Sequence, residues 1–108
     1  MFGFLFGSAR PQVVCTDGFT MSVQASRGHY SDPRSDEGPY EAVEVGFPSE
    51  VEPLLMEYIE MMGNNPVESV YPYVPVDVVQ AIIVKHGGVH SDMAGTEWDQ
   101  PGLPAMQR

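Results

Sequence analysis

Cysteine is nearly absent from the sequence, and so is every pattern that depends on it. Cys15 is the only cysteine, which excludes an internal disulfide, and no CxxC or Cys/His spacing predicts a structural zinc site. Cys15 lies in a strand-like run, where a small core residue is a better interpretation than a nucleophile. A reducing compartment is therefore the expected location.

Positive charge is scarce and is missing from the middle of the chain. Five Lys and Arg stand against fifteen Asp and Glu, and no Lys or Arg lies between Arg34 and Lys85. Such a surface repels phosphate backbones, which argues against direct nucleic-acid binding, and it attracts a basic protein partner. The alternative is that the acidity only keeps a small domain soluble. The expected partner-binding carboxylates are Glu44, Glu50, Glu57 and Glu60.

The sequence has no apolar run long enough for a membrane span. The opening MFGFLFGSARP is broken by glycine, lacks a basic residue before its apolar part, and is far shorter than the ~20 residues of a bilayer-spanning helix. We expect no signal peptide and no membrane partner. Residues 1–11 should form an apolar arm that docks either on its own domain or on a partner. The candidate anchors at the two ends are Phe2, Phe4, Phe6 and Trp98.

Sequence motifs of the common enzyme classes are also missing. There is no P-loop, GxGxxG, GxSxG or HExxH pattern. His86, His90 and Asp92 could be read as metal ligands, but Gly87 and Gly88 interrupt the helix that would hold both histidines on one face. We therefore expect no catalytic residue, no metal and no cofactor, and a protein that is not an enzyme.

Residues 27–40, within the loop predicted at residues 26–40, are the remaining candidate for a site. They combine two of the five basic residues with His and Tyr, which can hydrogen-bond to and stack on a small anionic or aromatic ligand. Alternatively, the arginines pair with Asp32, Asp36 or Glu37 and hold the long loop in place. The candidate contact residues are Arg27, His29, Tyr30 and Arg34.

Residues 12–25, QVVCTDGFTMSVQA, predict a β-hairpin. Asp17-Gly18 is typical of a two-residue hairpin turn. After the turn, apolar and polar residues alternate, as in a strand with one buried face. The apolar members are Phe19, Met21, Val23 and Ala25.

Residues 49–62, SEVEPLLMEYIEMM, predict an amphipathic α-helix. Ser49 and Glu52 form a capping-box pattern, Pro53 places the regular part from about Glu52 onward, and Gly63 suits the end. The apolar stripe at α-helical spacing consists of Val51, Leu54, Leu55, Tyr58, Ile59 and Met62.

Two further strands and a second helix complete the predicted fold. Val43, Val45 and Phe47 share one face of a third strand. Residues 70–74 form a fourth, which Pro72 places at a sheet edge or a bulge. Residues 75–88 predict a helix that ends at Gly87. Its core stripe is Val78, Val79, Ile82 and Ile83.

The expected fold is therefore α+β, with a small antiparallel sheet of about four strands and two helices in the order β-β-β-α-β-α. A chain of 108 residues can bury one core, so a single domain is expected over residues 12–89. Residues 90–108 lack periodicity and are expected to form an irregular tail.

Two stretches, HYSDPRSDEGPYEAVEVGFPS and VYPYVPVDVVQAIIVKHGGV, together resemble small, mostly uncharacterised proteins encoded by tailed bacteriophages and their prophages. The resemblance covers roughly residues 17–89 and implies no activity or catalytic residue. It does imply a context, the host cytoplasm or the virion. Small phage proteins that are not enzymes often bind and block host machinery, including defence systems, or are minor virion components.

Three functional hypotheses follow from the sequence. The leading one is a non-enzymatic accessory protein whose acidic surface docks on a basic host or defence protein that handles nucleic acid. The first alternative is a minor virion or assembly component that uses its terminal arms. The second alternative is a small-ligand binder or enzyme centred on residues 27–40.

Overall fold

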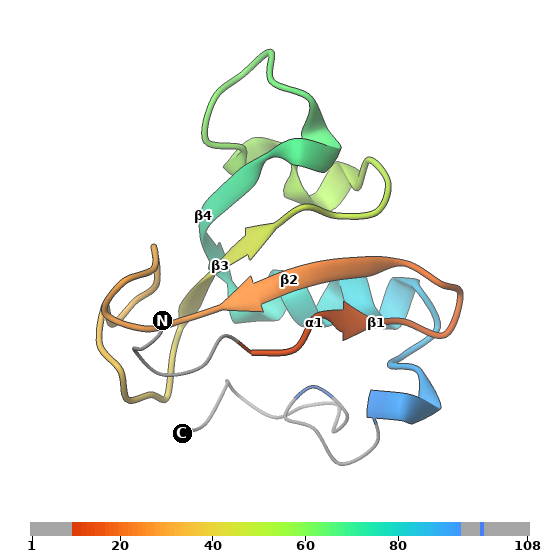
Figure 1. Ribbon diagram of the computed structural model, residues 1–108, viewed down its shortest axis with the longest axis horizontal. Coiled ribbons are helices and arrows are strands. Elements are labelled where there is room, and N and C mark those ends of the chain that lie inside the picture. Colours follow the sequence, from red (N-terminus) through yellow and green to blue (C-terminus); the bar gives the residue numbers. More distant parts are fainter. Residues whose placement is uncertain (1–9, 94–97, 99–108) are drawn as a thin grey trace.

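The computed structural model describes residues 10–93 and residue 98 (Figure 1). Its strands form one four-stranded antiparallel sheet in the order β1-β2-β3-β4, which confirms the predicted α+β class. The elements are β1 (Val13–Val14), β2 (Thr20–Gln24), β3 (Ala42–Gly46), β4 (Val70–Pro75), α1 (Val76–Lys85) and the 3-10 helices η1 (Pro53–Tyr58), η2 (Pro66–Glu68) and η3 (Ser91–Met93).

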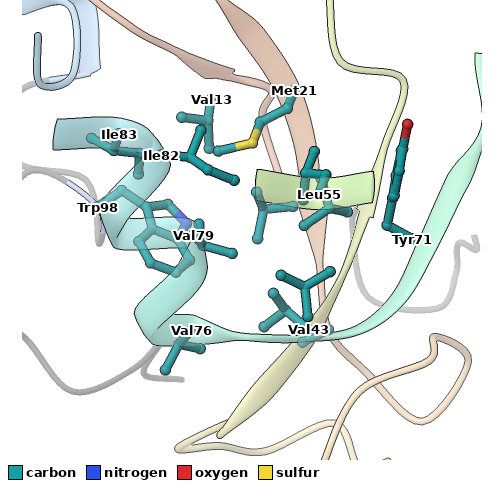
Figure 2. Close-up of a cluster of buried hydrophobic side chains, with 14 of the residues drawn as sticks. Val13, Met21, Val43, Leu55, Tyr71, Val76, Val79, Ile82, Ile83 and Trp98 are labelled. Atoms are coloured by element: carbon teal, nitrogen blue, oxygen red, sulfur yellow. The ribbon is translucent and has the colours of Figure 1, made fainter. Parts of the chain in front are cut away.

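The sheet is a meander with one face buried under α1. Each strand pairs with the next along the chain, so Val13 lies opposite Met21 and Val23 opposite Val45. These side chains are buried, and in Figure 2 Val79 of α1 lies among the side chains contributed by the strands. Burial of this apolar surface is the main stabilising term of such a domain.

The predicted hairpin is confirmed, but its loop has three residues rather than two. The Cys15 amide donates to the Phe19 carbonyl at 2.8 Å, and the Gly18 amide donates to the Cys15 carbonyl at 3.0 Å. Gly18 has φ 96°, a left-handed conformation that glycine adopts without steric cost. The loop is thus a turn closed by a left-handed glycine, the usual three-residue hairpin connection.

The third strand is shorter than predicted, and Phe47 is not on its buried face. Val43 and Val45 are fully buried as expected. The strand ends at Gly46, and Phe47 adopts φ 53° with its side chain 53% exposed. A left-handed residue interrupts the period-2 alternation, which is why the pattern fails at this position.

β4 is an edge strand of the sheet, as Pro72 predicts. It pairs with β3 on one side, with a register shift between Val43 and Val45. Its other side is partly covered by loops, because Tyr73 donates its amide to the Tyr30 carbonyl at 3.1 Å. Tyr73 itself has φ 55°, a strained conformation for an aromatic residue.

The predicted α-helix at residues 49–62 is wrong in type and length. Only η1 is helical here, and it is a 3-10 helix that begins at Pro53. Glu52, not Ser49, caps it, because the Glu52 carboxylate accepts the Leu54 amide. Ile59 ends it with an extended backbone.

The residues that η1 buries differ from the predicted apolar stripe, because η1 is a 3-10 helix. A 3-10 helix repeats every three residues rather than every 3.6. Glu52 and Leu55 therefore point inward and are buried, while Val51 and Leu54 are 54% and 41% exposed. Met62, the last residue of the predicted stripe, is 82% exposed.

The second predicted helix is confirmed as α1. Pro75 is its N-cap, and Gly87 follows the last turn with φ 92°. Three of the four predicted core residues are buried, and Val78 packs partly buried against the core. The buried side chains of α1 are Val76, Val79, Ile82 and Ile83.

Packing continues beyond residue 89. Val89 forms a β-bridge with Cys15, and Met93 and Trp98 are buried. Figure 2 shows Trp98 beside Ile83 of α1, so this candidate anchor belongs to the core of its own domain. The other candidate anchors, Phe2, Phe4 and Phe6, lie outside the described residues.

Candidate functional site

Four charged side chains form a hydrogen-bonded chain beneath η1, which we call the buried network: Asp17, Glu52, Lys85 and His86. Glu52 lies at its centre and is 1% exposed. One Glu52 oxygen accepts Lys85 Nζ at 2.8 Å, and the other lies 2.7 Å from His86 Nε2. His86 Nδ1 lies 2.6 Å from Asp17 Oδ2.

Three segments that are far apart in the sequence bring these side chains together. Asp17 comes from the hairpin loop, Glu52 from the start of η1, and Lys85 and His86 from the end of α1. The Asp17 amide also donates to the His86 carbonyl at 3.2 Å, and the Phe19 ring stacks on the imidazole with centroids 4.1 Å apart. The backbone, a ring and two carboxylates thus fix the orientation of His86.

The geometry fits the doubly protonated form of His86. A neutral imidazole has one N–H, so it can donate to only one carboxylate, whereas the imidazolium donates to both. Burial alone would lower the pKa of His86, but the hydrogen bonds to Glu52 and Asp17 outweigh it and raise the pKa above its ordinary value.

The pKa values of the two carboxyl groups shift in the opposite direction. Burial would raise the pKa of Glu52, but hydrogen bonds from Lys85, the Leu54 amide and His86 hold it below its ordinary value. The pKa of Asp17 is lowered by the Phe19 amide first and by His86 second. Two cations and two anions therefore balance within the buried network.

This arrangement is suited to holding segments together rather than to reacting with a substrate. Both imidazole nitrogens are engaged, and Phe19 stacks on the ring. Cys15 is fully buried, as the sequence predicts, and burial raises the pKa of its thiol to about 11, so it is not a thiolate at neutral pH.

The 26–40 loop brings together only part of the predicted contact set. Arg27 pairs with Asp36 through Nε at 3.3 Å, and its amide donates to the same carboxylate. His29 Nδ1 lies 2.6 Å from the Ser26 hydroxyl. These contacts match the alternative in which the charged side chains of the loop hold it in place.

Tyr30 and Arg34, in contrast, do lie together at the surface. The Arg34 guanidinium lies 5.1 Å from the Tyr30 ring centroid, and the Tyr73 ring lies 5.9 Å from it. The Tyr30 amide donates to the Glu44 carboxylate at 2.9 Å. Glu44, a predicted partner-binding residue, therefore supports this loop from β3.

The other three predicted carboxylates are exposed on and around η1. Glu50 precedes the helix, Glu57 lies within it, and Glu60 follows it. They accompany the outward side chains Val51 and Leu54. Exposed apolar and acidic side chains therefore occur together in this segment.

The candidate metal ligands His86, His90 and Asp92 do not form one site. His86 is turned toward Glu52, and His90 Nδ1 instead accepts the Asp92 amide at 3.1 Å. Within residues 10–93 and 98, no group of three ligating side chains could hold a metal ion. In the same part of the chain, no helix has the length and apolar character that crossing a membrane requires.

Sequence reasoning missed the buried network. The sequence pattern places Asp17 correctly in a turn, but it assigns Glu52 to a capping box with Ser49, whereas Glu52 is itself the N-cap of η1. Glu52 lies three residues before Leu55, a spacing that puts the two on one side of either a 3-10 helix or an α-helix. That spacing does not show which charged side chains Glu52 meets.

Comparisons with family models, with curated proteins and with solved structures find no match to this chain.

Proposed function

We propose that this chain is a non-enzymatic acidic accessory protein of the kind encoded by tailed phages, and that it acts by binding a basic protein. The observation that carries the proposal is the segment of residues 50–60 in and around η1, where exposed apolar side chains alternate with exposed carboxylates. We call this surface the docking face: Glu50, Val51, Leu54, Glu57 and Glu60.

The apolar members supply contact area. Val51 and Leu54 are large apolar side chains that the fold leaves in water, and Leu54 lies three residues before Glu57, so the two share one side of the 3-10 helix. Burial of such side chains at the centre of an interface removes apolar surface from water, while a polar rim excludes water around them.

The charge of the docking face selects the partner. Residues 35–84 contain ten Asp and Glu and no Lys or Arg, so carboxylates here meet no cation from their own segment. A field of one sign accelerates association with a basic surface and disfavours acidic partners. Proteins that handle nucleic acid carry such basic surfaces, which makes a host or defence protein of that class the proposed target.

The chemistry of the chain supports binding over catalysis. The imidazole nitrogens of His86 face carboxylates, and the thiol of Cys15 is buried. Trp98 packs in the core of its own domain, which favours docking through the folded surface over assembly through that arm.

Affinity capture from host lysate with matched charge-reversal variants tests the proposal. The tagged wild-type chain should retain a basic protein at low salt and lose it as salt rises. The double variant Glu57→Lys/Glu60→Lys should bind the purified partner roughly tenfold or more weakly. Nucleic acid should compete for the same partner.

Asp92→Lys is the matched control, because Asp92 is exposed and lies outside the docking face. Asp92→Lys changes the net charge by half as much as Glu57→Lys/Glu60→Lys and should leave the affinity nearly unchanged. The second control, Asp92→Lys/Asp36→Lys, changes the net charge by the same amount as Glu57→Lys/Glu60→Lys and should also leave the affinity nearly unchanged. Equal weakening by both double variants would show that net charge, not the docking face, governs binding, and would contradict the proposal.

A further inference from the structure

The docking face and the buried network share the same short helix. Glu52 caps η1 by accepting the Leu54 amide at 2.9 Å, and Leu54 belongs to the docking face. Val51 precedes Glu52 directly in the chain. The arrangement of the docking face therefore depends on the contacts that hold Glu52 against α1.

Among the described residues, the charged groups that face His86 come from the hairpin loop and from the start of η1. Asp17 faces the imidazole from the hairpin loop and Glu52 from the start of η1, and Lys85 of α1 reaches the second Glu52 oxygen. Cys15, which lies near Asp17, stays a neutral thiol because its pKa is about 11. His86 is thus the group of this set whose ordinary titration lies nearest neutral pH.

Loss of the His86 proton weakens the hydrogen bond that Glu52 accepts from the imidazole. The remaining N–H stays on Nε2, because Glu52 is buried and cannot be rehydrated, whereas Asp17 is half exposed. Glu52 then accepts from a neutral donor instead of a cationic one, which is a weaker hydrogen bond. The network also passes from balanced charge to one net negative charge in a place of low dielectric.

We propose that the imidazolium form of His86 holds η1, and with it the docking face, in its binding arrangement, and that release of the proton loosens η1. Lys85 and the buried Leu55 still hold the helix, so the change is a local opening and not unfolding. The consequence for binding rests on the proposed function, but the opening itself does not.

Nuclear magnetic resonance on the free protein tests the opening. The ring nitrogens of His86 report its titration, and the hydrogen-exchange protection factor of the Leu54 amide reports η1. We expect the protection of Leu54 to fall about tenfold as His86 loses its proton. The Val76 amide, which donates to the Glu41 carbonyl at 3.0 Å at the other end of α1 from His86, is the internal reference and should keep its protection.

The variant Asp17→Asn shows whether the two events are coupled. It removes one of the two carboxylates that favour the imidazolium, so the His86 midpoint should move to lower pH, and the Leu54 transition should move with it. Asp36→Asn removes the same charge from the exposed 26–40 loop and should move neither. A Leu54 protection factor that stays constant while His86 titrates would overturn the proposal.

A synthetic amphipathic peptide of Lys and Leu probes the docking face across the same pH range. Affinity that declines with the His86 midpoint supports the proposal. If the protection of the Leu54 amide falls with the titration of His86 but the peptide binds at no pH, the proton-dependent opening stands and the proposed function fails. If the peptide binds with no pH dependence and Leu54 stays protected, docking stands and the proton-dependent opening is overturned.

Discussion

The molecule contains two clusters in which a histidine lies near arginine or lysine and carboxylates, and they behave differently. In the 26–40 loop the members are neighbours in sequence, and the Arg27–Asp36 pair is exposed. In the buried network the members come from three segments, and Glu52 and His86 are almost fully buried. The first cluster can be recognised from the sequence because its residues are neighbours in the chain. The second cluster exists only in the folded protein, which brings its residues together and buries two of them.

Burial accounts for the difference in energy. An exposed ion pair contributes about 0–1 kcal/mol, since water and salt compete with it. Removing one partner of a buried pair costs about 3–5 kcal/mol, because the remaining charge is left without compensation. The two histidines therefore offer a direct comparison within one chain.

The largest expected effect is that of removing His86. Among the described residues, His86→Ala leaves the buried Glu52 with Lys85 as its one charged partner, and we expect the free energy of unfolding to fall by about 3 kcal/mol. Denaturant unfolding measures this loss. His29→Ala, which breaks a contact with the Ser26 hydroxyl, should cost less than about 1 kcal/mol. Similar losses for both variants would remove the distinction between the clusters.

The two leucines of η1 test the three-residue period of that helix. Leu55 is fully buried, so Leu55→Ala should cost about 2–3 kcal/mol, whereas the partly exposed Leu54 should tolerate alanine within about 1 kcal/mol. Comparison of the two unfolding curves gives the difference directly. An α-helix with the predicted stripe would bury both side chains and make the two losses similar.

The pH dependence of stability should show two declines. Asp17 and Glu52 have lowered pKa values in the folded state, so their contribution is present above about pH 4 and lost as pH falls through the folded values. His86 has a raised pKa, so its contribution is present below its unfolded pKa and lost as pH rises through the folded one. In His86→Ala the alkaline decline attributed to His86 should disappear, as thermal melting across the pH range would reveal.

The smallest expected effect lies in the exposed cluster. Arg27→Ala removes the ion pair with Asp36 and should change the free energy of unfolding by less than about 0.5 kcal/mol. Added salt should not enlarge that difference, because the pair is already screened. A loss as large as that of His86→Ala would mean that the 26–40 loop, not the buried network, organises the fold.

Elements with local signals could be predicted from the sequence. The hairpin follows from Asp17-Gly18 and the alternation after it, and α1 follows from its apolar spacing and Gly87. Both signals act within a few residues. They therefore hold regardless of the remainder of the fold.

The remainder depended on contacts between distant segments. Residues 49–62 fit an α-helical period, but the 3-10 helix is the form that places Glu52 beside Lys85 and His86, more than thirty residues away. No spacing in the sequence shows that these side chains meet. The three exposed carboxylates around η1 were identified as candidates from charge alone, and their role in binding stays a prediction.

The most direct test of the account is the protonation state of His86 in the folded protein. A titration of the imidazole nitrogens followed by nuclear magnetic resonance should place the His86 midpoint above the ordinary histidine value. Below that midpoint both nitrogens should be protonated, with the Nδ1 and Nε2 protons protected from solvent. His29, whose Nδ1 meets a hydroxyl rather than a carboxylate, serves as the internal comparison in the same sample. A His86 midpoint at or below the ordinary histidine value would contradict the buried imidazolium that we propose to hold η1.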